Sequence, residues 1–114
     1  MIVLERIYDK ENKQGYRILV DRLWPRGVRK EDLNHDLWLK EAAPSDALRK
    51  KFHHESERWE SFEAGYRQEL SQKPEIIEQL KRLEKEKGTL VFLYSAKNSE
   101  QNNAIVLKAV VEGT

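Results

Sequence analysis

The stretch Leu90-Val91-Phe92-Leu93-Tyr94 decides the fold class, because it is apolar from end to end. A strand whose side chains do not alternate between polar and apolar is usually covered on both of its faces. Such strands are typical of a parallel or mixed sheet that lies between helices. The stretch therefore predicts the central strand of an α/β domain.

Two further strands are predicted upstream, at residues 2–8 and 16–20, which are rich in Val, Ile, Leu and Tyr. The polar segment 9–15 between them is too short for a helical crossover, so the two strands should be antiparallel if they are adjacent. Residues 36–40 are a candidate third strand, although five residues do not separate strand from helix. A short helix is expected near residues 29–33.

Helices are predicted through the middle of the chain and at its end, from apolar stripes and from residues that start or stop helices. One stripe recurs at three- and four-residue steps and consists of Trp59, Phe62, Tyr66 and Leu70. The start and stop signals are Ser45, Ser56 and Ser99 as N-caps, Pro74 in a first turn and Gly88 at a C-terminus. The prediction is a small mixed or parallel sheet of about four strands, flanked by helices, with a helical excursion before the central strand.

The composition describes one polar but globular domain. The chain has 114 residues, of which 39% are hydrophobic and 36% are charged, and it contains three tryptophans. A core can form at this length, but only one. The sequence shows no repeat, low-complexity tract or linker, so we place a single domain at residues 1–114.

The charge balance and the lack of cysteine exclude several classes of protein. Lysine and arginine number 21 against 20 acidic residues, which gives a net charge of +1, although residues 1–30 carry a local excess of +4. This near balance gives no electrostatic reason to expect nucleic acid or an anionic membrane as the main partner. Without cysteine there is no disulfide framework, thiolate zinc site or cysteine nucleophile. No apolar run is long enough for a signal peptide or a membrane helix, and we expect a soluble, cytoplasmic protein.

The segment directly after the second predicted strand is the first candidate site. It holds Asp21, Arg22, Trp24 and Arg26, with a Pro/Gly turn that would fix their directions. In an open α/β sheet, ligands bind beyond the carboxyl ends of the strands, and arginine holds phosphate or carboxylate with two hydrogen bonds. The alternative is structural: Asp21 pairs with an arginine and Trp24 belongs to the core.

The second candidate lies between the central strand and the last helix, at Tyr94, Ser95, Lys97 and Asn98. The ammonium, the hydroxyl and the N-terminus of the following helix would stabilise an anion there. In the alternative, Ser95, Asn98 and Asn102 only cap the helix. A nucleophile and base pair formed by Ser95 and Lys97 is a third interpretation.

A third helix start, with Lys40 before it and Ser45 and Arg49 within it, could converge with the first two candidates. On its own it is an ordinary capped helix. The run His53-His54-Glu55 invites a metal interpretation, but neighbouring side chains on a helix diverge and a site needs three or four ligands. We therefore predict no metal and no cofactor.

The run from Gly15 to Gly27, with Asp21-Arg22-Leu23-Trp24-Pro25-Arg26 inside it, resembles the signature of the YeaO-like family, domain of unknown function 488. Further matches follow in order: Ala43-Pro44-Ser45 with Leu48-Arg49, Phe52 with His54, Arg58-Trp59 with Phe62, Tyr66 with Glu69-Leu70, residues 93–98, and Asn102 with Ala104, Val106 and Leu107. The resemblance spans essentially the whole chain. It implies a family without an assigned reaction, so no catalytic role is carried over. Relatives often have Asp in place of Asn98 and His in place of Asn103, which favours binding over proton transfer in this segment.

Together these features predict one site for a small anionic ligand, such as a nucleotide, a phosphorylated metabolite or a carboxylate. Ligand contacts are predicted for Arg22, Trp24, Arg26, Lys40, Ser45, Arg49, Tyr94, Ser95, Lys97, Asn98 and Asn102, and the residues considered for catalysis are Asp21, Ser95 and Lys97. Whether a reaction takes place stays open, as does the oligomeric state. The alternative function is a non-catalytic protein-interaction domain, and nucleic-acid binding through the basic residues 1–30 ranks below both.

Overall fold

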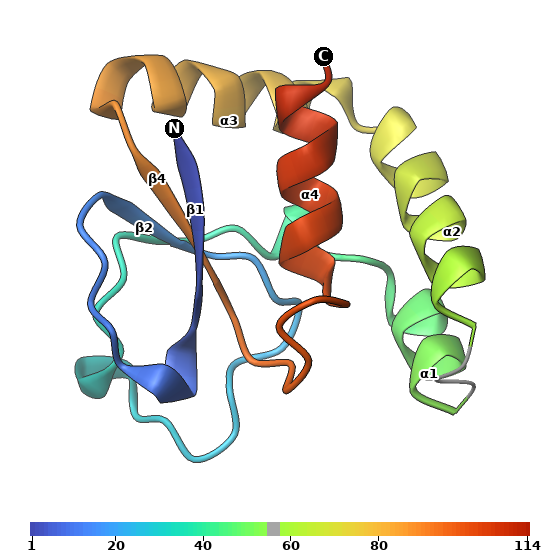
Figure 1. The fold of residues 1–114 in the computed structure, drawn as a ribbon, viewed down its shortest axis with the longest axis horizontal. Helices are drawn as coiled ribbons and strands as arrows, with labels where there is room; N and C mark the ends of the chain where they lie inside the picture. Colours follow the sequence, from blue (N-terminus) through green and yellow to red (C-terminus); the bar gives the residue numbers. More distant parts are fainter. Residues whose placement is uncertain (55–57) are drawn as a thin grey trace.

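The protein folds around a four-stranded parallel sheet, as a computed structural model that describes residues 1–54 and 58–114 shows (Figure 1). The strands are β1 (Ile2–Arg6), β2 (Tyr16–Leu19), β3 (Leu37–Trp38) and β4 (Leu90–Tyr94), in the spatial order β1-β4-β2-β3. Each neighbouring pair is parallel. The predicted α/β class and the count of about four strands are confirmed.

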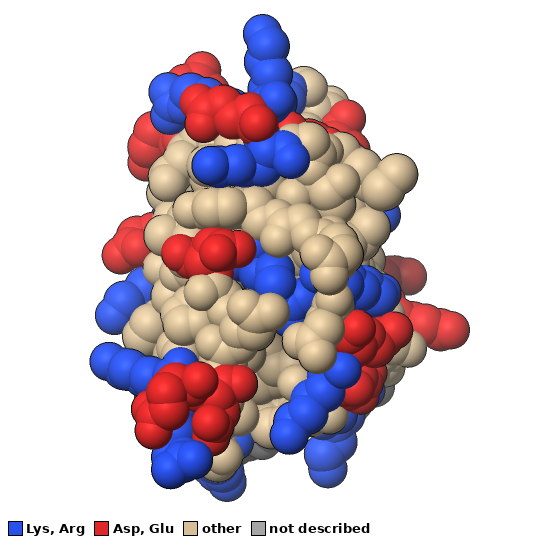
Figure 2. Space-filling model, turned by 90° about the vertical axis from the view of Figure 1, so that its left-hand side faces the viewer, with Lys and Arg blue, Asp and Glu red and all other residues tan. Residues whose placement is uncertain are grey.

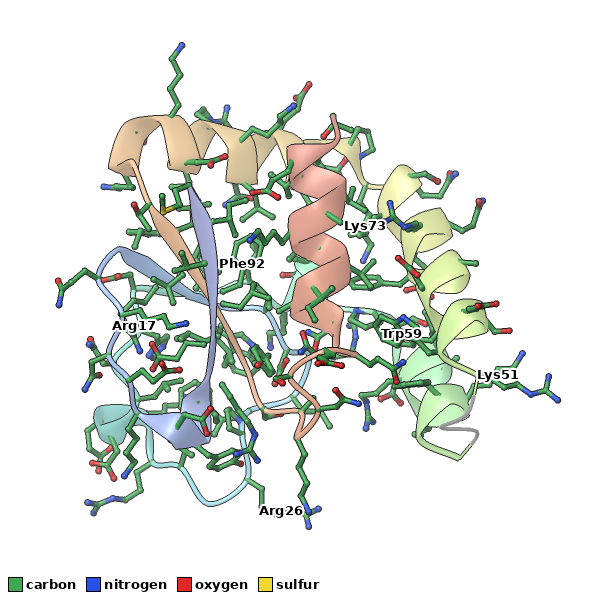
Figure 3. The ribbon with its side chains drawn as sticks, in the orientation of Figure 1. Arg17, Arg26, Lys51, Trp59, Lys73 and Phe92 are labelled. Atoms are coloured by element: carbon green, nitrogen blue, oxygen red, sulfur yellow. The ribbon has the colours of Figure 1, made fainter. Side chains whose placement is uncertain are left out.

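Strand β4 is the central strand that the apolar run predicted, and it is buried on both faces. Leu90, Phe92 and Tyr94 point into one apolar cluster, whereas Val91 and Leu93 point into a second cluster on the opposite face. All five side chains are buried, because alternate residues of a strand face opposite sides of the sheet. Figure 3 labels Phe92 at the centre of the molecule.

Four helices contribute to the cluster that contains Phe92. They are α1 (Asp46–His54), α2 (Trp59–Ser71), α3 (Pro74–Lys87) and α4 (Asn103–Glu112). Their inward-facing residues include Leu48 of α1, Phe62 of α2, Leu80 of α3 and Leu107 of α4.

The other face of the sheet is covered by the chain that joins β2 to β3. Trp24, Val28 and Leu33 of this segment pack with Trp38 against Val91 and Leu93 of β4. The segment contains one short 3-10 helix, Lys30–Asp32, where the sequence predicted a short helix. Side chains of this loop segment therefore cover one face of the sheet, whereas helices cover the other face.

The expectation for the first two strands depended on their being adjacent, and they are not. Strand β4 lies between β1 and β2 and pairs with both, so all three run in the same direction. Strand β1 also ends earlier than predicted, at Arg6, where the chain enters a 3-10 turn at Ile7–Asp9.

The local signals place most helix ends correctly. The hydroxyl of Ser45 accepts from the backbone N–H of Leu48 at the start of α1, Pro74 lies in the first turn of α3, and Gly88 follows its last residue. Ser56 lies outside the described residues.

The prediction that Ser99 caps the last helix is wrong. Asn102 is the N-cap, and its side chain accepts from the N–H of Ile105. The reason is local competition, because the carboxamide of Asn98 accepts from the N–H groups of Glu100 and Gln101 and holds the preceding residues in a turn.

A buried ion pair ties the first loop to the sheet. Arg17 donates to both carboxylate oxygens of Glu5, at 3.0 and 3.1 Å, and also to the carbonyls of Lys13 and Asn34. Burial alone would raise the pKa of Glu5, but hydrogen bonds from Arg17 and from the backbone of Lys13 and Asn12 outweigh it, and the pKa lies below its usual range. The pair is therefore a structural clasp across β1 and β2.

The surface charges are mixed. On the face shown in Figure 2, Lys and Arg side chains are interspersed with Asp and Glu. No helix of the described chain is long and apolar enough to span a bilayer.

Candidate functional site

The candidate site lies at the carboxyl ends of β2 and β4, where the chain leaves the two neighbouring strands in opposite directions. After β2 it turns to the face covered by Trp24 and Val28, and after β4 it leads into α4 on the helical face. Such a divergence opens a crevice at the strand ends, which is where ligands bind in open α/β sheets. Asp21 follows β2 and Ser95 follows β4, and the two residues are hydrogen-bonded to each other at this edge of the sheet.

Asp21 connects the two strand ends through three hydrogen bonds. Its Oδ2 accepts from the backbone N–H of Ser95 at 3.0 Å and from the Ser95 hydroxyl at 2.7 Å. Its Oδ1 accepts from the amide of Asn103 at 3.1 Å, and the same amide donates to the carbonyl of Val20. The hydroxyl of Ser95 is therefore paired with Asp21, which leaves Lys97 without the role of its base in this arrangement.

Burial raises the pKa of Asp21, and the hydrogen bonds from Ser95 and Asn103 offset only part of that effect. The proton is thus bound more tightly in the folded than in the unfolded state, and folding is favoured as the pH falls through the raised pKa. We therefore expect the wild type to gain stability relative to the Asp21→Asn variant as the pH falls. The difference between their free energies of unfolding, wild type minus variant, should grow from neutral to mildly acidic pH.

Urea denaturation over that pH range measures this difference. Glu5→Gln serves as the control of opposite sign, because the pKa of Glu5 is lowered and its contribution is lost as the pH falls. A difference for Asp21→Asn that stays flat, or that shrinks on acidification, would contradict the prediction.

A cleft of about 870 Å³ opens around Asp21. Its lining comes from the ends of β1, β2 and β4, from α1 and α2, and from the start of α4. The lining residues are Arg6, Tyr8, Asp21, Arg22, Leu23, Trp24, Pro25, Arg26, Pro44, Arg49, Phe52, Phe62, Ser95, Ala96, Lys97, Gln101, Asn102 and Asn103. Five of these side chains are cationic, whereas Asp21 is the one carboxylate among the described lining residues. The cleft therefore carries an excess of positive charge.

Two of these five cations donate hydrogen bonds to backbone carbonyls. Arg22 donates from Nε to the carbonyl of Pro44 at 2.9 Å, and Arg6 donates from Nε to the carbonyl of Ala96 at 3.0 Å. A guanidinium has five N–H donors. One or two of them can therefore bind backbone carbonyls while the others remain available to a ligand. Arg26 is exposed, and Figure 3 labels it at the lower edge of the molecule.

The structure brings most of the predicted site residues to this cleft. Those that line it are Asp21, Arg22, Trp24, Arg26, Arg49, Ser95, Lys97 and Asn102. Trp24 also has a structural role, because its indole N–H donates to the carbonyl of Val28 and its ring packs edge-on against Trp38.

Four predicted residues do not line the cleft. The ammonium of Lys40 lies 4.5 Å from the ring centroid of Trp38, and Ser45 caps α1. Tyr94 is buried on the helical face, and burial raises the pKa of its hydroxyl. Asn98 holds the turn before α4.

Sequence reasoning missed six lining residues of chemical interest: Arg6, Tyr8, Phe52, Phe62, Gln101 and Asn103. Arg6 carried no sequence signal, because the first strand was predicted to run to residue 8, whereas in the structure Arg6 ends β1 and pairs in register with Tyr94 at the end of β4. Nothing in the local sequence around Phe52 and Phe62 separates a cleft wall from ordinary core.

No group of three or more His, Asp and Glu side chains suited to a metal ion occurs within the described part of the chain. The run His53-His54-Glu55 lies outside the described side chains.

Comparison with known proteins gives a family without an assigned reaction. A family model described as "Inactive DUF488-N3 subclade" matches residues 1–114. The chain is 50% identical over 107 residues to the uncharacterized protein YeaO of Escherichia coli K12, covering 93% of this chain and 92% of YeaO. It is 42% identical over 74 residues to the uncharacterized protein Rv3073c of Mycobacterium tuberculosis, covering 64% of this chain and 63% of that one. Among solved structures, none is significantly similar to the chain.

Proposed function

We propose that this chain, which belongs to the DUF488-N3 family in the subclade described as inactive, binds a small anion in the cleft at the carboxyl ends of β2 and β4 without transforming it. One observation carries the proposal: five cations converge on a cleft whose described lining holds a single carboxylate. A carboxylate or phosphate ligand would offset this charge, and hydrogen bonds between such groups and arginine are among the strong ones.

Binding without reaction is favoured by the state of the polar groups at the base of the cleft. Asp21 accepts three hydrogen bonds and the hydroxyl of Ser95 is one of the donors. Asn103 donates to Asp21 and to the carbonyl of Val20, which ties the start of α4 to the chain that directly follows β2. An amide in that place is a fixed donor and takes up no proton.

The test is thermal unfolding against phosphate, phosphorylated metabolites, nucleotides and carboxylates. A ligand at a hundred times its dissociation constant should stabilise the fold by about 2.7 kcal/mol. We expect Arg26→Ala and Arg22→Gln to reduce the shift, whereas Arg82→Ala on α3 should leave it unchanged, because Arg82 is exposed and does not line the cleft. A shift that survives in both cleft variants would place the ligand elsewhere.

The alternative function, a protein-interaction domain, is favoured by two exposed apolar side chains at the cleft, Leu23 (55% exposed) and Tyr8 (39%). If no compound of the panel shifts the unfolding temperature, this alternative gains support. A molecular mass that rises with protein concentration in the wild type, and less in Leu23→Ser, would then indicate self-association through this patch.

A further inference from the structure

We propose that the ligand of the cleft carries two anionic groups, one at each end, and lies between two separate clusters of cations. The inference rests on the proposed function and specifies its ligand. The helix-side cluster is Arg22 with Arg49, and the strand-side cluster is Arg6, Arg26 and Lys97. Together they hold all five cations of the described lining.

The helix-side cluster is anchored at the start of α1. Arg22 donates from Nε to the carbonyl of Pro44 at 2.9 Å and from Nη2 to the carbonyl of Ala43 at 3.4 Å. Arg49 is the fourth residue of α1, and its Nη2 donates to the Asp46 carboxylate at 2.6 Å. Both guanidinium groups are therefore fixed by contacts that use only part of their donors.

The strand-side cluster gathers around Tyr8. The guanidinium of Arg6 lies 4.8 Å from the centroid of the Tyr8 ring, and the Tyr8 hydroxyl donates to the carbonyl of Arg26 at 2.7 Å. Arg6 also donates from Nε to the carbonyl of Ala96, the residue before Lys97. These contacts join three segments that are far apart in the sequence, and each segment contributes one cation to the same end of the cleft.

Both clusters keep donors that a ligand can reach. Nη1 of Arg22, Nη1 of Arg49 and Nη2 of Arg6 have no partner among the described residues. In that part of the chain, the one buried side-chain nitrogen or oxygen without a partner is Nε of Arg49, which takes no part in this proposal. The three unpaired Nη groups are therefore accessible, and Arg26 and Lys97 are exposed.

The two clusters lie at opposite ends of segment 22–26. Arg22 begins this segment and Arg26 ends it, with apolar residues between them that include Leu23, which is 55% exposed. Figure 1 shows α1 and the turn after β1 on opposite sides of residues 95–102. A single phosphate or acetate would contact one cluster, whereas a longer ligand with an apolar middle would contact both. The cleft volume of about 870 Å³ falls in the range of pockets that take drug-sized ligands.

The experiment is isothermal titration calorimetry of the full chain with succinate, adipate and suberate, and with bisphosphonates of the same chain lengths. Each dianion is compared with the monoanion of its own length, such as hexanoate for adipate. We expect at least one dianion to bind about tenfold or more tighter than its matched monoanion, because a second charged contact forms. Dianions too short to span the two clusters should lose this advantage. The two series show whether carboxylate or phosphonate groups are preferred.

One variant in each cluster tests the placement. Arg49→Gln and Lys97→Gln should each reduce the preference for the dianion over its matched monoanion at least threefold, because one end of the ligand loses a charged partner. The monoanion can still bind at the intact cluster, so its affinity should change less. Both side chains are at least partly exposed, so we expect both variants to fold. Arg82→Gln, on the exposed face of α3, is the matched control and should change neither affinity.

The outcomes separate this inference from the proposed function. If monoanions bind in the cleft but no dianion exceeds its matched monoanion, the anion site stands and the two-ended ligand is overturned. If a dianion binds more tightly but either cluster variant keeps the full preference, the placement between the clusters is wrong. If no anion binds, both proposals fail together.

Discussion

Arg17→Met is expected to lower the free energy of unfolding by about 3–5 kcal/mol, the usual cost of removing one partner from a buried ion pair. Arg17 and Glu5 are only 6% and 1% exposed, and the guanidinium donates to both carboxylate oxygens. The variant would leave the charge of Glu5 buried with only the N–H groups of Asn12 and Lys13 to hold it.

Chemical denaturation of three variants tests this expectation. The double variant Glu5→Leu/Arg17→Met should recover much of the loss, because no unpaired charge remains. Arg67→Met, which removes an exposed i,i+4 pair with Glu63, should cost less than about 1 kcal/mol. An Arg17→Met variant that is no less stable than Arg67→Met would refute the structural role of the clasp.

Gly15→Ala is expected to cost about 3 kcal/mol, because two penalties meet at this residue. Its φ of +146° is a conformation that L side chains rarely adopt, and an added Cβ would lie 2.8 Å from the carbonyl oxygen of Thr89. That oxygen cannot move freely, because it accepts the hydrogen bond from Tyr16 that begins the pairing of β2 with β4.

Gly27→Ala is the matched control for that variant. Gly27 also has a positive φ, +78°, but an added Cβ would meet nothing within 4 Å, so only the backbone penalty of about 1 kcal/mol applies. Both variants are compared by urea denaturation. If the two variants lose the same free energy of unfolding, the close approach of the added Cβ at residue 15 to the Thr89 carbonyl does not destabilise the fold.

The fold was predictable from sequence where local pattern alone decides it. The apolar run at β4, the stripe of α2 and the signals at Ser45, Pro74 and Gly88 each act over a few residues. Strand order was not predictable, because the pairing of Ile2 with Leu90 joins residues at opposite ends of the chain. The start of α4 was misplaced because Ser99 and Asn102 are both good caps and the turn held by Asn98 decides between them.

The candidate site was predictable to the extent that parallel strands bring their carboxyl ends to one edge. Asp21 and Ser95 follow neighbouring strands and meet for that reason. Phe52 and Phe62 reach the cleft through the packing of α1 on α2, which no local pattern specifies. Lys40 does not line the cleft, and its ammonium group lies over the ring of Trp38 instead, a contact between side chains that the local sequence did not indicate.

The place of β4 in the sheet has a consequence for how the protein is made. It is the last strand in the chain but lies between the first two, so β1 and β2 leave the ribosome before the strand that both pair with has been synthesised. Until residues 90–94 emerge, β1 has no native partner and β2 has only the two residues of β3. The nascent chain thus carries unpaired strand edges through most of its synthesis, and this is the stage at which it is most exposed to mispairing and aggregation.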